Sequence, residues 1–132
     1  MVITAELPAY IPNPKHLNTS TADAQWTILE VEEHASFISS WENGWCFQGE
    51  AWGLHLVDSK IVNLGRTEAP VEDSFIAKFV SSAEPVTWHG YPADRRKNQD
   101  IPPREIRHAW LSNELLSPAK ISKIGKGKRC HL

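Results

Sequence analysis

The chain has 132 residues, of which 41% are hydrophobic and 23% charged, and its formal net charge at pH 7 is −2. This length suits one domain, and this composition is typical of a globular protein, which excludes a fibrous or disordered chain. The sequence contains neither an apolar run of the roughly 20 residues that a membrane-spanning helix needs nor a secretory leader, so it predicts a cytoplasmic protein without a membrane partner.

Charge is distributed unevenly along the chain. Residues 1–94, the acidic body, hold four Lys and Arg against thirteen Asp and Glu, a net of −9. Residues 95–132, the basic arm, hold ten against three, a net of +7. The arm either offers a surface to an anionic partner or folds back onto the acidic body, and the sequence leaves both alternatives open.

The first 44 residues predict a strand, a loop, a second strand and a helix. Residues 2–7 predict a short edge strand, and the proline-rich stretch 7–21 predicts a surface loop. The β-branched and aromatic content of residues 26–31 is typical of a half-buried strand. From about residue 33 the apolar residues repeat at helical spacing, which predicts a helix over 33–42 that ends near Gly44.

The central part predicts a small antiparallel sheet. Its strands are expected at residues 45–47, 51–57, 60–64 and 86–88, with Asp58 and Ser59 as a hairpin turn. Between them, residues 73–82 have apolar positions four apart behind Asp73 or Ser74 as an N-cap, so a helix is predicted there. The residues after Trp88 predict a turn that reaches Asp94.

The basic arm predicts two helices that form a hairpin over residues 103–125. Trp110 lies on the apolar stripe of the first helix, and Ser117 with Pro118 has the pattern of a cap followed by the first helical residue. Gly125 and Gly127 end the second helix. The whole pattern predicts a single α+β domain, a small antiparallel sheet with packed helices and a C-terminal helical hairpin.

Residues 117–129, with the sequence SPAKISKIGKGKR, resemble the second helix and following turn of the repressor-type helix-turn-helix family over about a tenth of the chain. That resemblance implies a helix that enters the major groove of DNA. The preceding helix departs from the family pattern, because it carries Trp110 where the family has small residues. The alternative is an amphipathic hairpin that leaves its lysines in water and buries Trp110, Leu115, Ile121 and Ile124 against the body.

A broader nucleic-acid interface needs no recognition helix. Ten cations of the arm are candidates to contact a phosphate backbone, and such binding would be salt-sensitive and weak in sequence preference. The alternative is that they pair with carboxylates of the body. The candidates are Arg95, Arg96, Lys97, Arg104, Arg107, Lys120, Lys123, Lys126, Lys128 and Arg129.

Residues 88–94 place an imidazole, a phenol and a carboxylate close together in sequence, on His89, Tyr91 and Asp94. Such groups can serve as general acid, general base or orienting partner. The alternative is a structural turn in which His89 hydrogen-bonds to the backbone. We favour the structural interpretation, and we expect His89→Ala to alter stability rather than any chemistry.

Six tryptophans are many for this length. Most should fill the core, but Trp41, Trp45 and Trp52 are near two glycines and predict an apolar surface for a protein partner. Cys46 and Cys130 are far apart, so both are expected to be free thiols, and no metal site is predicted.

These patterns favour a small non-catalytic accessory or interaction protein that binds another protein or belongs to a complex. Two alternatives remain: a nucleic-acid-binding protein that uses the basic arm, and a small enzyme centred on His89. No phosphate-binding loop or nucleophile motif is present, so no cofactor is expected. The oligomeric state stays open.

Overall fold

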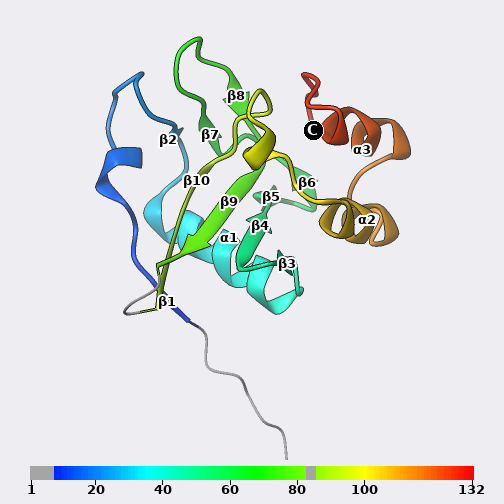
Figure 1. The fold of residues 1–132 in the computed structure, drawn as a ribbon, viewed down its shortest axis with the longest axis horizontal. Helices are drawn as coiled ribbons and strands as arrows, with labels where there is room; N and C mark the ends of the chain where they lie inside the picture. Colours follow the sequence, from blue (N-terminus) through cyan, green and yellow to red (C-terminus); the bar gives the residue numbers. More distant parts are fainter. Residues whose placement is uncertain (1–7, 83–85) are drawn as a thin grey trace, which may run out of the picture.

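The computed structural model describes residues 8–82 and 86–132, and within these ranges a mixed five-stranded sheet forms the centre of the molecule (Figure 1). Its order is β1-β10-β9-β4-β3, and all neighbours are antiparallel except β1 and β10, which are parallel. The strands are β1 (Ala9–Tyr10), β10 (Thr87–Pro92), β9 (Ala77–Ser81), β4 (Glu50–Gly53) and β3 (Cys46–Phe47).

Two smaller antiparallel sheets and three α-helices complete the described fold, which is α+β as predicted. One sheet has the order β2-β7-β8 and the other is the hairpin β5-β6, which turns at Asp58 and Ser59 as expected. The bounds are β2 (Gln25–Trp26), β7 (Gly65–Arg66), β8 (Asp73–Ser74), β5 (Leu56–Val57), β6 (Lys60–Ile61), α1 (Glu30–Glu42), α2 (Arg104–Ser112) and α3 (Pro118–Gly125), with 3₁₀ turns η1 (Pro14–His16) and η2 (Asn98–Asp100).

The two faces of the main sheet differ in chemistry because successive side chains of a strand point to opposite faces. On one face Ala51 and Phe79 pair across β4 and β9, and they pack with Phe37 of α1 in an apolar core. On the other face the register aligns Trp52, Lys78 and Tyr91. Lys78 is only 4% exposed, so this second face holds a buried charge.

The helical hairpin of the basic arm closes a second apolar cluster. Ile106 and Trp110 of α2 and Ile124 of α3 pack with Trp52 and Trp45 of the body. The Ser117 Oγ accepts a hydrogen bond from the Lys120 N–H at 3.3 Å, so Ser117 is the N-cap that the sequence predicted. The arm is therefore docked on the body rather than extended from it.

The helix predicted over residues 73–82 is wrong. Residues 73–74 form the edge strand β8, and β9 follows as a central strand between β4 and β10. Both faces of β9 carry apolar residues, Phe79 on one and Val80 on the other, so this short strand shows nearly the same apolar pattern as a buried helix.

Three further expectations need correction. The strand predicted over 26–31 ends at Trp26, because the acidic first turn of α1 begins at Glu30 and the Glu32 carboxylate accepts the Leu29 N–H at 2.9 Å. The turn predicted after Trp88 is strand instead, since β10 continues to Pro92 in pairing with β9. The loop over 7–21 includes strand β1, and the strand predicted at 2–7 lies outside the described residues.

Among the described residues, no helix combines the length and apolar character needed to cross a membrane.

Candidate functional site

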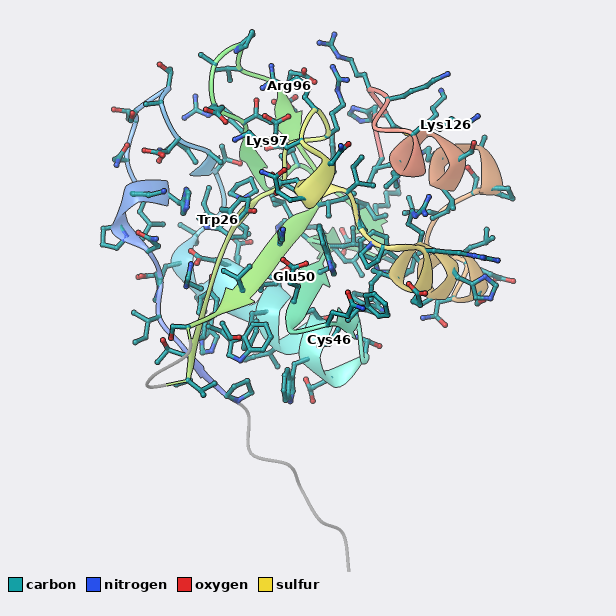
Figure 2. The ribbon with its side chains drawn as sticks, viewed as in Figure 1. Trp26, Cys46, Glu50, Arg96, Lys97 and Lys126 are labelled. Carbon is teal, nitrogen blue, oxygen red and sulfur yellow. The ribbon has the colours of Figure 1, made fainter. Side chains whose placement is uncertain are left out.

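Two concavities lie on either side of the loop that joins β10 to α2, and Asp100 of this loop lines both. We call the larger one, about 420 Å³, the strand cleft, because residues 71–76 around β8 form one of its walls. We call the smaller one, about 290 Å³, the histidine pocket, because His16 lines it. Figure 2 shows Arg96 and Lys97 on this loop near the end of the main sheet.

The strand cleft has an apolar floor between two polar walls. Ile76, Ile101 and Ile124 contribute to the floor, and residues 128–132 form the wall opposite β8. Several contacts hold that wall. Lys120 Nζ donates to the Leu132 oxygen at 3.1 Å, and the His131 ring packs edge-on against Phe75 at 4.8 Å between centroids. Arg129 Nε also lies 3.5 Å from the Glu72 carboxylate.

The backbone of β8 is hydrogen-bonded to another strand on one side only. In the described chain, β8 has β7 on one side and no strand on the other. The Glu72 and Ser74 carbonyls accept hydrogen bonds from Thr67 and Leu64 at 2.9 and 3.0 Å, so the intervening residue Asp73 directs its N–H and C=O toward the open edge. No described residue hydrogen-bonds to the backbone of Phe75. The cleft therefore contains a free strand edge.

Charge at the mouth of the strand cleft is concentrated on Glu72. Arg95 donates two hydrogen bonds to its carboxylate, at 2.9 and 2.8 Å, and Arg129 Nε lies 3.5 Å away. The hydrogen bonds from Arg95 lower the pKa of Glu72. Lys128 also lines the cleft, and no described carboxylate pairs with it. Arg96 Nε also lies 3.8 Å from this carboxylate, so Glu72 pairs with three arginines. Lys128 is a further cation of the lining, which also contains Asp73 and Asp100.

Behind the histidine pocket lies a buried hydrogen-bonded network. The Tyr91 hydroxyl donates to Asp100 Oδ1 at 2.7 Å, and the Asp94 N–H donates to Asp100 Oδ2 at 2.9 Å. Lys78 Nζ donates to the Gln99 carbonyl at 2.5 Å and pairs with Glu50 at 3.0 Å. A buried charge is tolerated only when it is paired, and Lys78 meets this condition.

The pKa shifts in this network follow from burial and pairing. Burial, together with the hydrogen bond to Asp100, raises the pKa of Tyr91. Burial alone would raise the pKa of Asp94, but the hydrogen bonds from Arg96 reverse the effect and lower it. Asp94 is thus an ionised carboxylate held by Arg96, and Tyr91 is a neutral donor.

Of the three candidate catalytic residues, the structure brings Tyr91 and Asp94 to the histidine pocket. His89 lies on β10 opposite Val80, and no described residue hydrogen-bonds to its imidazole, so the backbone bond expected in a turn is absent. Sequence reasoning missed His16 and Asp100. Neither had a signal in the sequence, because the parallel pairing of β1 with β10 and the turn η2 bring them to the site.

The ten candidate cations divide into paired and exposed groups. Arg95 and Arg129 pair with Glu72, and Arg96 pairs with Asp94 at 2.9 Å. Lys97 pairs with Glu68. Arg107 and Lys120 are half-buried. The exposed cations without a carboxylate partner among the described residues are Arg104, Lys123, Lys126 and Lys128, and Figure 2 shows Lys126 at the end of α3.

The three candidate tryptophans do not form one surface. Trp45 and Trp52 are 3% and 1% exposed and lie in the cluster closed by α2 and α3. Trp41 is half-buried, with its ring 5.9 Å from that of Trp88. Of these three indoles, only that of Trp41 can contribute to a surface for a protein partner.

Within the described residues, no three His, Cys, Asp or Glu side chains converge as a metal site, and Cys46 and Cys130 are free thiols. No family model matches this sequence, and neither characterised proteins nor solved structures yield a match.

Proposed function

We propose that this protein is a non-catalytic binding protein that takes an extended, acidic segment of a partner protein into the strand cleft. The segment pairs with β8 as an added strand. The observation that carries this proposal is the open edge of β8 inside a cleft with an apolar floor. Strand addition of this kind is a common mode of peptide recognition, in which main-chain hydrogen bonds supply affinity and pockets for alternate side chains supply specificity.

The floor and the opposite wall define what the segment should carry. Ile76, Ile101 and Ile124 favour an apolar side chain that points into the cleft. Lys128 and Arg129 favour a carboxylate on the segment, since Lys128 has no described partner and the Arg129 side chain is 77% exposed. Complementary charge of this kind mainly improves the association rate and the choice of partner.

A protein segment fits this cleft better than a nucleic acid. A nucleic-acid strand carries a phosphate at every nucleotide, and binding along β8 would place phosphates beside Glu72 and Asp73. A peptide can place one carboxylate near Lys128 and leave the rest of the β8 wall to neutral groups. Four of the ten candidate cations are also already paired with carboxylates of the body.

The test is a selection from a random peptide library of about ten residues on the intact chain, followed by affinity measurements on the selected peptides. We expect sequences with alternating apolar and acidic residues. Asp73→Pro should weaken their binding at least about tenfold, because it removes an N–H from the open edge. Asp73→Asn, which keeps the N–H and loses the charge, is the matched control and should not weaken binding.

A second pair of variants keeps the proposal testable if Asp73→Pro does not fold. Lys128→Glu with Arg129→Glu should weaken the selected peptides, whereas Lys123→Glu with Lys126→Glu makes the same charge change outside the cleft and should have little effect. Peptide binding that is indifferent to both cleft variants overturns the proposal. So does a salt-sensitive complex with duplex DNA that is stronger than any peptide complex.

A further inference from the structure

The histidine pocket lies on the other side of the β10–α2 loop and is independent of the strand cleft proposal. Three segments enclose it: residues 15–24 ahead of β2, Glu68, and residues 91–100 from the end of β10 to η2. A water molecule occupies about 30 Å³ in the liquid, so a volume of about 290 Å³ admits roughly ten non-hydrogen atoms. This is the size of a single substituted ring.

His16 lines this pocket and has an unused acceptor. Its residue is 6% exposed, and its Nδ1 lies 2.8 Å from the Ala24 carbonyl oxygen. A carbonyl only accepts, so Nδ1 carries the proton and Nε2 keeps a lone pair. No described residue bonds to Nε2, yet Nε2 is not among the described side-chain atoms that are both buried and unpartnered. Nε2 therefore has access to solvent, and the pocket is a concavity that His16 lines.

The neighbouring groups favour a flat ligand. The Tyr91 ring lies 5.5 Å from the His16 ring, tilted by 30°, and both rings line the pocket together with Pro92. The Tyr91 hydroxyl donates its proton to Asp100, so it is not free to donate to a ligand. Burial lowers the pKa of His16, which keeps the imidazole a neutral acceptor at neutral pH.

Two lysines stand where the pocket meets solvent. Lys15 lies 3.7 Å from Asp23 with 59% of its side chain exposed, and Lys97 pairs with Glu68 with 44% exposed. Exposed ion pairs of this kind are weak, so either ammonium can turn to an anionic ligand. The two other carboxylates of the lining also have partners, because Arg96 pairs with Asp94 and the Tyr91 hydroxyl donates to Asp100.

We propose that the histidine pocket binds a small planar heterocycle of pyrimidine size, whose ring N–H donates to His16 Nε2 and whose anionic substituent reaches Lys15 and Lys97. His16 is the recognition residue of this site. A ligand without a ring N–H leaves the Nε2 lone pair unpaired, and a ligand without the anion leaves both lysines with their present partners.

The test is a titration of the intact chain with uracil-6-carboxylate, followed through the imidazole nitrogens of His16 by NMR. The Nε2 resonance should shift and saturate at millimolar ligand or below. Uracil, which lacks the anion, should bind several-fold more weakly, and 1,3-dimethyluracil, which lacks the N–H, should not shift Nε2 at all. His16→Phe should weaken binding at least tenfold.

The matched control is His34→Phe. This exposed imidazole stacks on Tyr10 at 5.5 Å and does not line the pocket, so its loss should leave the affinity unchanged. If His16→Phe does not fold, Lys97→Met should abolish the preference for the carboxylated ring over uracil. The proposal fails if no saturating shift occurs, or if 1,3-dimethyluracil binds as tightly as uracil.

Discussion

A single buried carboxyl, that of Glu33, makes the stability of the fold depend on pH. Its carboxyl is 0% exposed beneath β1, its Oε2 accepts a hydrogen bond from the Tyr10 hydroxyl, and its Oε1 has no partner among the described residues. Burial disfavours the charged form and raises the pKa of Glu33 to about 6, from an ordinary value of 4.5. The fold therefore binds a proton at Glu33 more tightly than the unfolded chain does.

This difference predicts that the stability of the fold decreases as the pH rises. A carboxyl whose pKa is raised by folding costs nothing below its unfolded pKa and destabilises the fold above its folded pKa. The free energy of unfolding should thus gain a falling component between pH 4.5 and about 6, of roughly 2 kcal/mol in total. Glu33→Gln keeps an acceptor for Tyr10 but cannot ionise, so it should lack this component.

Urea denaturation across this pH range measures the effect. Relative to the natural chain, Glu33→Gln should be about equally stable near pH 4 and more stable near pH 7. A difference between the two proteins that does not change with pH would show that Glu33 does not titrate in this range.

At the scale of the element, the sequence predicted helices better than strands. The helical hairpin predicted over residues 103–125 was found as α2 (Arg104–Ser112) and α3 (Pro118–Gly125), since caps and prolines act locally. Residues 73–82 were misassigned, because the strand β9 is recognisable only from its pairing with β4 and β10. An apolar run of this length fits a helix or a central strand equally well.

Helix α3 offers a direct test of the local argument. Ser117→Ala removes the oxygen that accepts the Lys120 N–H, and losing an N-cap typically costs about 0.5–2 kcal/mol. We expect the free energy of unfolding to fall by that amount, and the melting temperature to fall with it. Ser122→Ala, on the exposed side of the same helix, is the matched control and should be close to neutral. Equal effects of the two substitutions would contradict a capping role for Ser117.

At the scale of the whole molecule, ion pairs between the basic arm and the acidic body partly neutralise the uneven charge. Arg95 donates two hydrogen bonds to the Glu72 carboxylate and a third to the Gly127 carbonyl at 3.2 Å. Lys123 and Lys126 remain exposed on α3 without a described carboxylate partner. The alternative in which the arm folds back onto the body is therefore partly realised, and a surface for an anionic partner stays a prediction.

The contact between arm and body predicts a measurable coupling. In a double-mutant cycle of Arg95→Met and Glu72→Gln, we expect a coupling energy of about 1 kcal/mol, since the pair is bidentate and partly buried. The same cycle with Lys128→Met in place of Arg95→Met should give a value near zero. A negligible coupling in the first cycle, measured by urea denaturation, would mean that the Arg95–Glu72 pair does not hold the arm to the body.

The sequence alone determined what acts over a few residues: the α+β class, the hairpin at Asp58 and Ser59, the helical hairpin of the arm and its Ser117 cap. It also placed Tyr91 and Asp94 among the candidate site residues, because their chemical types cluster along the chain. Only the tertiary structure decided that His16 lies against Tyr91, that Lys78 is buried beside Asp100, and that β8 has an open edge inside a cleft. These features depend on pairings between segments distant in sequence, whose energy comes from contacts and burial that local propensity and periodicity do not contain.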